Sequence, residues 1–244
     1  MQQGIYEILE NREIAEDVCQ LRLKTEENLD IRCGQFVNVK IDSLFLRRPI
    51  SVADYDRGIL TLIYKVVGEG TRLLSEKREG KLDLLTGLGN GYDLSLSTEK
   101  PLLIGGGVGV PPLYYLAKEF VKEGREVGVV LGFNKKEEIF YEEEFRALGC
   151  KVCVTTADGS YGIRGFVTDA LKEMDYSYFY TCGPLPMLKA VCKSTAFSGQ
   201  ISLEERMGCG FGACMGCSVK VKGGYKRICK EGPVFKKEEL LWED

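Results

Sequence analysis

The sequence predicts a β-barrel followed by an α/β domain and a short cysteine-rich segment. Three observations support this fold class. Strand-like runs with little helical pattern fill residues 1–97, and strands alternate with helices over 98–200. Beyond residue 200 this periodicity ends, and glycines and four cysteines follow. We therefore divide the chain at residues 1–97, 98–200 and 201–244.

The first part has the pattern of short antiparallel strands. Residues 18–23 and 36–41 alternate apolar and polar side chains, as a half-buried strand does. Residues 59–67 form a β-branched apolar run, and only 70–80 has a helical pattern. Several short strands separated by glycines and charged turns predict a small antiparallel barrel.

The second part alternates strands with helices. A buried strand at 102–104 enters a glycine run at 105–109, and a helix with Pro111 or Pro112 in its first turn should follow. The other expected strands are 127–133, 151–156 and 176–181, and the other expected helices are 137–148, 166–174 and 184–194. This alternation predicts a parallel sheet with helices on both faces.

Composition excludes several classes of function. The 244 residues include no histidine, which excludes Ser-His-Asp and Cys-His catalysis, His-ligated zinc, haem on a proximal His and Rieske clusters. The net charge of −3 gives no electrostatic footprint for nucleic acid. No apolar run approaches the ~18 residues of a membrane-spanning helix. Because the first residues lack a secretory pattern, we expect a cytoplasmic protein.

Ten cysteines without an export signal favour metal or redox chemistry, or buried thiols, over a disulfide framework. Cys209, Cys214 and Cys217 have C-x4-C-x2-C spacing, and Cys229 adds a fourth thiol. The first three match the spacing of plant-type [2Fe–2S] sites, and the glycines among them permit a tight wrap around two irons. The short gap before Cys229 indicates a cluster-binding segment rather than a whole ferredoxin domain.

A structural zinc site is the alternative for these four thiolates. Zinc ribbons usually pair two C-x2-C knuckles, whereas this segment has one. Cys150 and Cys153 have the same spacing, but an odd separation on a strand points them to opposite faces. We expect these two, and Cys19, Cys33 and Cys192, to be buried thiols.

The glycine run at 105–109 lies between a strand and a helix. Backbone N–H groups and the positive helix end favour a pyrophosphate there, although the run is not the strict G-x-G-x-x-G fingerprint. A tight turn without a ligand is the alternative. The usual acidic ribose ligand is missing after the second strand, where Lys135 and Lys136 stand instead. These lysines either face a 2′-phosphate or are solvated, so both NAD and NADP stay open.

Four motifs in order resemble the ferredoxin–NADP-reductase superfamily. They are Leu-Arg-Arg-Pro-Ile-Ser at 46–51, Gly-Glu-Gly-Thr at 68–71, the glycines and prolines at 105–112, and the C-terminal cysteines. With the cysteines included, nearly the whole chain is similar to the electron-transfer subunits of B-type, NAD-dependent dihydroorotate dehydrogenases. The resemblance implies an FAD-binding barrel, an NAD-binding domain and a [2Fe–2S] segment.

The resemblance also implies site residues. Arg48 suits the FAD pyrophosphate because its planar fork pairs with phosphate oxygens, and a solvated pair with Arg47 is the alternative. Ser51 would lie near the isoalloxazine ring, and Ile50 replaces an aromatic residue that the superfamily usually has. The implied FAD-binding set is Arg48, Pro49, Ile50, Ser51, Ile63, Tyr64, Lys65, Gly70 and Thr71.

A second implied set binds the nicotinamide nucleotide. It comprises Gly106, Gly107, Val108, Gly109, Asp158, Cys182, Gly183 and Pro184. The last four follow expected strands at their carboxyl ends, where open α/β sheets bind ligands. A loop cap and a buried thiol are the alternatives for Asp158 and Cys182. The cluster set is Cys209, Cys214, Cys217 and Cys229, and no catalytic residue is expected because cofactors carry hydride chemistry.

Finally, the resemblance implies a partner. It is an FMN-containing catalytic subunit that interconverts dihydroorotate and orotate in pyrimidine biosynthesis, joined in a heterotetramer of two subunits of each kind. Electrons would run from dihydroorotate through FMN, the cluster and FAD to NAD. Related subunits of sulfide dehydrogenases, hydrogenases and NADP–ferredoxin oxidoreductases are an alternative, although some of them carry an aspartate in place of one cluster cysteine. A zinc-bound regulatory module is the non-enzymatic alternative.

Overall fold

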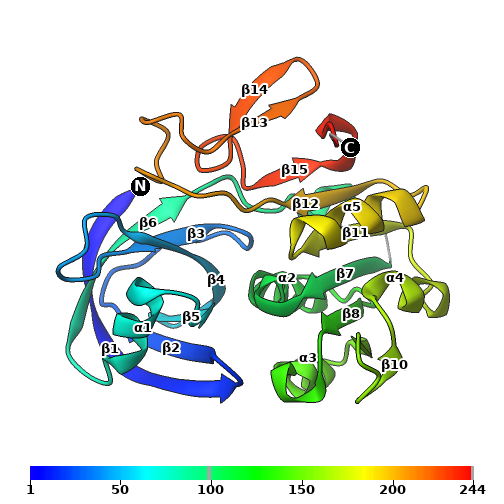
Figure 1. Ribbon diagram of the computed structural model, residues 1–244, viewed down its shortest axis with the longest axis horizontal. Helices are drawn as coiled ribbons and strands as arrows, with labels where there is room; N and C mark the ends of the chain where they lie inside the picture. Colours follow the sequence, from blue (N-terminus) through cyan, green and yellow to red (C-terminus); the bar gives the residue numbers. More distant parts are fainter. Residues whose placement is uncertain (98–99, 243–244) are drawn as a thin grey trace.

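In the computed structural model, which describes residues 1–97 and 100–242, a barrel lies beside a mostly parallel sheet, and the C-terminal segment lies along both (Figure 1). Among these residues, no helix combines the length and the apolar character needed to cross a membrane.

Six antiparallel strands close the barrel in the order β1-β2-β5-β4-β3-β6, which confirms the predicted antiparallel barrel. Along β1, Tyr6 and Ile8 are buried while Glu7 and Leu9 face outward, so one face fills the barrel core. The strands are β1 (Gln2–Ala15), β2 (Val18–Lys24), β3 (Phe36–Val39), β4 (Arg48–Asp56), β5 (Ile59–Lys65) and β6 (Lys81–Leu88). One helix, α1 (Glu69–Glu76), connects β5 to β6.

A seven-stranded sheet forms the second half of the molecule, in the order β10-β9-β8-β7-β11-β12-β15. Its strands are β7 (Pro101–Gly106), β8 (Gly128–Phe133), β9 (Lys151–Thr156), β10 (Ile163–Arg164), β11 (Tyr178–Cys182), β12 (Gly199–Ser202) and β15 (Val234–Lys236). All neighbours pair in parallel except β15, which pairs antiparallel with β12. The predicted parallel sheet is therefore confirmed, with one antiparallel edge strand.

Helices cover both faces of this sheet. They are α2 (Pro111–Lys122), α3 (Glu142–Ala147), α4 (Val167–Ala170) and α5 (Leu185–Ser194). Phe120 of α2 and Phe145 of α3 share a core with the barrel and with Val129 of β8. Val130, the next residue of β8, lies in the opposite core with α4 and α5. The alternating side chains of one buried strand thus fill two cores.

Two expected helices are shorter than the sequence pattern predicted. The helix expected at 137–148 is a 3₁₀ turn, η3 (Lys136–Glu138), followed by α3. Between them Tyr141 has φ +65°, its hydroxyl accepts a hydrogen bond from Gln20 Nε2 at 2.8 Å, and its ring packs edge-on against Tyr114. Contact with the barrel therefore overrides local helix propensity. The helix expected at 166–174 is α4 followed by a 3₁₀ turn, η4 (Leu171–Glu173).

The C-terminal segment packs against both the barrel and the sheet. Its hairpin consists of β13 (Ser218–Val221) and β14 (Gly224–Arg227), and its last strand is β15. Cys217 and Cys229 share a core with Phe36 of the barrel and Ile201 of β12. The division that we drew at residue 201 falls inside β12, so the nucleotide domain and the cysteine segment share a strand.

Candidate functional site

A cavity of about 420 Å³ lies where the barrel meets the end of β12 and the C-terminal segment. Eight of the nine residues predicted to bind FAD line it, namely Arg48, Pro49, Ile50, Ser51, Ile63, Tyr64, Lys65 and Thr71. Strand β4 supplies the first four and β5 the next three. The sequence motifs at 48–51 and 63–65 therefore come together on one wall, because their strands are neighbours in the barrel.

Gly70, the ninth predicted residue, lies outside the lining and packs against the guanidinium of Arg48. A Cβ at Gly70 would stand 2.7 Å from Cζ of Arg48, so a glycine is needed for the guanidinium to pack there. The hydroxyl of Thr71 accepts hydrogen bonds from Val67 N and Gly68 N at 3.0 and 3.3 Å. The first turn of α1 and a cationic fork thus lie together at the cavity, an arrangement that suits a phosphate group.

The same cavity has a second wall that the sequence motifs did not indicate. It is formed by Phe36, Val108, Ser202, Leu203, Glu204, Glu205, Met207 and Pro233, and Val67, just after β5, completes the lining. Most of them lie far along the chain from the barrel and carry no motif, so only the tertiary fold brings them here. Val108 belongs to the predicted nucleotide-binding set, but it faces this first cavity.

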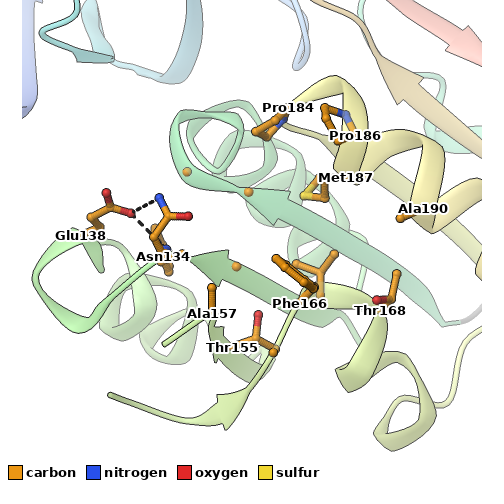
Figure 2. A pocket seen from close by; sticks show the side chains of 16 residues that line it. Asn134, Glu138, Thr155, Ala157, Phe166, Thr168, Pro184, Pro186, Met187 and Ala190 are labelled. Atoms are coloured by element: carbon orange, nitrogen blue, oxygen red, sulfur yellow. Dashed lines mark hydrogen bonds between the residues drawn. The ribbon is translucent and has the colours of Figure 1, made fainter. Parts of the chain in front are cut away.

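A second cavity of about 390 Å³ lies at the carboxyl ends of β7, β8 and β9 (Figure 2). Gly106, Gly107 and Pro184 of the predicted nucleotide set line it. Phe166, which is 69% exposed, comes from the residue before α4, and Met187 comes from α5 (Figure 2). The cavity is mainly apolar, with backbone groups of the glycine loop at one end, as expected for a nucleotide site.

The glycine loop connects the two cavities. Gly107 has φ +51° and borders the second cavity, while the next residue, Val108, borders the first. A Cβ at Gly109 would collide with the carbonyl group of Cys182, so Gly109 lets the loop pack on the end of β11. Gly183, with φ +156°, packs beside Gly106 N and Met187. These two glycines support the loop from outside the lining of either cavity.

Asp158 and Cys182 lie outside the linings of both cavities. The exposed carboxylate of Asp158 accepts hydrogen bonds from Ser160 Oγ and Ser160 N, which lower its pKa. Ala157, its neighbour, lines the second cavity instead. Cys182 is 1% exposed, and burial raises the pKa of its thiol. Asp158 therefore has the geometry of a loop cap and Cys182 that of a buried thiol, the two alternatives to nucleotide binding.

The structure separates Lys135 from the second cavity and brings Glu138 to it. Lys135 Nζ lies 2.5 Å from a carboxylate oxygen of Glu16 in the barrel. Glu138 lines the cavity and accepts hydrogen bonds from Asn134 N and Nδ2 at 3.1 and 2.9 Å. Burial alone would raise the pKa of Glu138, but Asn134 and Lys65 Nζ hold it below its usual value. Sequence analysis missed this carboxylate because it lies in the turn η3 rather than directly at the end of a strand.

The four predicted cluster cysteines form two pairs. Cys214 N donates to Cys209 Sγ at 3.4 Å, and Cys209 N donates to Cys214 Sγ at 3.5 Å. Cys229 N donates to Cys217 Sγ at 3.4 Å. Cys214 is exposed, whereas Cys217 and Cys229 are buried beside the barrel. Among residues 1–97 and 100–242, no three potential ligands gather closely enough to hold a single metal ion.

Backbone amides surround these sulfurs. Ala213 N donates to Cys209 Sγ at 3.2 Å, and Gly216 N donates to Cys214 Sγ at 3.5 Å. Burial by itself would raise the pKa of Cys209, but hydrogen bonds from Phe211, Cys214 and Ala213 lower it to about 6. Two pairs of thiols with amide donors fit two irons bridged by sulfide, and an ionised sulfur is the form that ligates metal.

Comparison with known proteins gives matches to the cysteine segment, to the nucleotide sheet and to the chain as a whole. Residues 204–241 match the iron-sulfur cluster binding domain of dihydroorotate dehydrogenase B, and residues 103–193 match the oxidoreductase NAD-binding domain. The chain is 46% identical to the electron transfer subunit of dihydroorotate dehydrogenase B (NAD(+)) from Fusobacterium nucleatum, covering 93% of each chain. It is 45% identical to the subunit of that name from Bacillus pumilus, covering 98% of each.

A solved structure has the same architecture. The NADH-dependent reduced ferredoxin–NADP oxidoreductase, described for flavin-based electron bifurcation, superposes with a TM-score of 0.88 at 33% identity. The match covers 98% of this chain and 90% of that one. The barrel, the parallel sheet and the C-terminal segment are therefore shared as one arrangement.

Proposed function

Because the chain belongs to the family of dihydroorotate dehydrogenase B electron transfer subunits, we propose that its two cavities and four cysteines form one electron path between a nicotinamide nucleotide and a partner protein. The chain is an oxidoreductase subunit that transfers electrons between NAD, FAD and an iron–sulfur cluster. The observation that carries the proposal is the loop at 107–108, where adjacent residues border the two cavities.

We assign FAD to the first cavity. Arg48 and the first turn of α1 bind its pyrophosphate, and Gly70 lets the guanidinium pack. Ser51 offers a hydroxyl to the ring system, and Ile50 and Ile63 exclude water from it. When bound, FAD and the cluster supply the exchange between two-electron and one-electron transfer. The protein itself contributes geometry and electrostatics, in agreement with a chain that has no histidine.

We assign NAD(H), in preference to NADP(H), to the second cavity. Within the part of the chain that the structure describes, no lysine or arginine lines this cavity to pair with a 2′-phosphate. It does contain Glu138, whose lowered pKa keeps it anionic at neutral pH. A carboxylate accepts hydrogen bonds from ribose hydroxyls and repels a phosphate. The alternative role for Lys135 at a 2′-phosphate is disfavoured by its ion pair with Glu16.

We assign the [2Fe–2S] cluster to Cys209, Cys214, Cys217 and Cys229. The buried pair lies on the barrel side beside Phe36, which also lines the first cavity. The exposed Cys214 lies on the solvent side. This arrangement would carry electrons from the flavin cavity outward to a partner. We propose that the partner is an FMN-containing dihydroorotate dehydrogenase subunit in a two-plus-two heterotetramer.

We further propose that the protein works in the cytoplasm. All ten cysteines are free thiols, and six of them lie outside the cluster set, which suits a reducing compartment. The solved oxidoreductase at 33% identity makes a ferredoxin–NADP partner the second candidate. The higher identity to dihydroorotate dehydrogenase subunits, 45–46%, favours the first.

Anaerobic reduction tests this path. The purified protein is expected to show flavin and iron–sulfur absorbance, and NADH should bleach both, with NADPH at least tenfold weaker in Kd. Glu138→Gln should reduce that discrimination, whereas Glu137→Gln, at an exposed neighbour outside the lining, should not. A colourless protein with one zinc per chain would refute the redox function, and equal binding of NADH and NADPH by the unmodified protein would refute the nucleotide assignment.

A further inference from the structure

Asn38 is the residue at which the barrel touches the loop of the first cluster cysteine. It lies on β3, is 1% exposed, and its Nδ2 donates to the carbonyl oxygen of Cys209 at 3.3 Å. A Cβ at Gly210 would collide with this Nδ2, and Gly210 itself has φ +76°. The loop backbone therefore lies directly on the Asn38 amide, and only glycine permits this approach.

The same strand face borders the flavin cavity. Phe36 and Asn38 are two residues apart, so their side chains leave β3 on the same side. Phe36 lines the first cavity and shares a core with Cys217 and Cys229. The cross-strand neighbour of Asn38 is Pro49, which also lines that cavity. Asn38 thus lies between the cavity assigned to FAD and the cysteines assigned to the cluster.

The hydrogen bonding of Asn38 differs from that of a structural anchor. Asn90 holds the other end of the segment with a complete set of bonds: its Nδ2 donates to the carbonyl oxygens of Glu231 and Val234, and its Oδ1 accepts from Val234 N. In contrast, Asn38 Oδ1 is buried without a partner among the described residues. A buried amide oxygen without a partner is costly and rare, so its presence at this position calls for an explanation other than anchoring.

We propose that Asn38 is a positioning residue of the electron path, whose amide fixes the Cys209 loop against the flavin-bearing strand and raises the reduction potential of the cluster. This inference rests on the proposed function. By fixing the Cys209 loop, the amide keeps Ala213 N and Cys214 N in place as donors to Cys209 Sγ, and such donors stabilise the reduced cluster, which carries one more negative charge. The rigid contact also keeps the separation between flavin cavity and cysteines constant.

Two substitutions at Asn38 distinguish the contribution of its N–H donor from that of the whole polar side chain. Asn38→Asp is nearly isosteric but replaces the donor with an anionic oxygen facing the Cys209 carbonyl, and Asn38→Leu removes all polarity. Gln200→Leu is the control, because Gln200 is 3% exposed and exchanges two hydrogen bonds with the Asp93 backbone outside both cavities. It reproduces the loss of a buried amide without touching the cysteine loop.

The experiment is an EPR-monitored redox titration of the FAD- and iron-loaded protein, with iron per FAD measured in parallel. Asn38→Asp should shift the flavin–cluster electron equilibrium at least tenfold toward the flavin, which is about 59 mV for one electron. Asn38→Leu should shift it less, in the same direction. Loss of iron in both Asn38 variants, with iron retained in Gln200→Leu, would support the anchoring role.

The proposal is overturned if the Asn38 variants keep their iron and an unchanged potential and EPR spectrum. It is equally overturned if Gln200→Leu shows the same shift or the same iron loss, because the effect would then follow from general destabilisation. Unmodified protein that gives no [2Fe–2S] signal would overturn the proposed function itself, so the two failures are distinguishable.

Discussion

The guanidinium of Arg48 packs against the Cα of Gly70, so that a Cβ on the glycine would lie 2.7 Å from Arg48 Cζ and 2.8 Å from its Nη2. This contact places the fork of Arg48 at the first turn of α1, where we propose that the pyrophosphate of FAD binds. The side chain at position 70 therefore controls where a residue twenty-two positions earlier points.

Gly70→Ala is expected to weaken FAD binding about tenfold, because the displaced guanidinium loses a charge-assisted hydrogen bond of roughly 1.5 kcal/mol. Arg48→Ala should have a similar effect, and the double variant should be no worse than Arg48→Ala alone. FAD retained per chain after gel filtration, and Kd by fluorescence, measure this. Arg47→Ala is the matched control, since Arg47 pairs with Asp83 instead. Full retention of FAD in Gly70→Ala would contradict the role of the contact.

The pair formed by Arg47 and Asp83 predicts a pH-dependent contribution to stability. Arg47 Nη1 donates to Asp83 Oδ1 at 2.9 Å and Nη2 donates to Oδ2 at 3.1 Å, and the two side chains are only 21% and 17% exposed. Burial alone would raise the pKa of Asp83, but Arg47 lowers it overall. A lowered pKa in the folded state contributes stability above the unfolded value of ~3.9, and this contribution disappears as pH falls through the folded value.

Asp83→Asn should therefore reduce the free energy of unfolding by about 1–2 kcal/mol at pH 7, and by much less near pH 3. Urea unfolding of both proteins at the two pH values measures the difference. An equal cost at both pH values would show that the ionised carboxylate is not responsible.

Another ion pair joins the barrel to helix α2, which packs on the nucleotide sheet. Lys118 Nζ of α2 lies 2.7 Å from both carboxylate oxygens of Asp54 on β4, and each side chain is 19% exposed. Lys118→Met should destabilise the protein by about 2 kcal/mol, because it leaves a mostly buried carboxylate without its cation. Lys118→Met combined with Asp54→Leu should recover part of this loss. A double-mutant cycle in urea gives the coupling, and strict additivity would refute it.

Cys214→Ser is expected to abolish the cluster and to leave NADH-driven reduction of FAD largely intact, because none of the four cysteines lines the cavities that we assign to the nucleotide and to FAD. The loss should appear as missing iron and missing visible absorbance beyond the flavin bands. Cys153→Ser, on β9, is the control and should keep the cluster. If FAD stays bound in Cys214→Ser but NADH no longer reduces it, the proposed order of carriers is wrong.

The sequence was informative where one period persisted over several residues. Alternation along 18–23 predicted β2, and the run at 127–133 predicted β8, because a half-buried or fully buried strand imposes its own pattern. The sequence was less informative where tertiary contacts determine the bounds of a helix or strand. Tyr141 interrupts the expected helix because its hydroxyl bonds to Gln20 of the barrel and its ring packs against Tyr114, and three-residue β15 is too short to carry a pattern.

The candidate site divides in the same way. Residues carried by motifs, such as Arg48 and Gly107, line the cavities. Glu138 and Asn38 carry no motif: Glu138 bonds to Asn134 across a turn, and Asn38 contacts Cys209, which the fold brings from the far end of the chain. Asp158 follows the end of a strand, as a ligand-binding residue would, but its carboxylate accepts a hydrogen bond within its own loop. Local patterns do not encode such meetings.

Strand β15 has a consequence for how this chain could be recombined. The strand that follows Cys229 covers the edge of β12 by pairing with it antiparallel. Truncation near residue 203 would remove the cysteines and also bare the backbone of β12, turning a finished sheet into a template for aggregation. The C-terminal segment therefore cannot be removed or exchanged as an independent unit. A protein that loses it needs another strand to pair with β12.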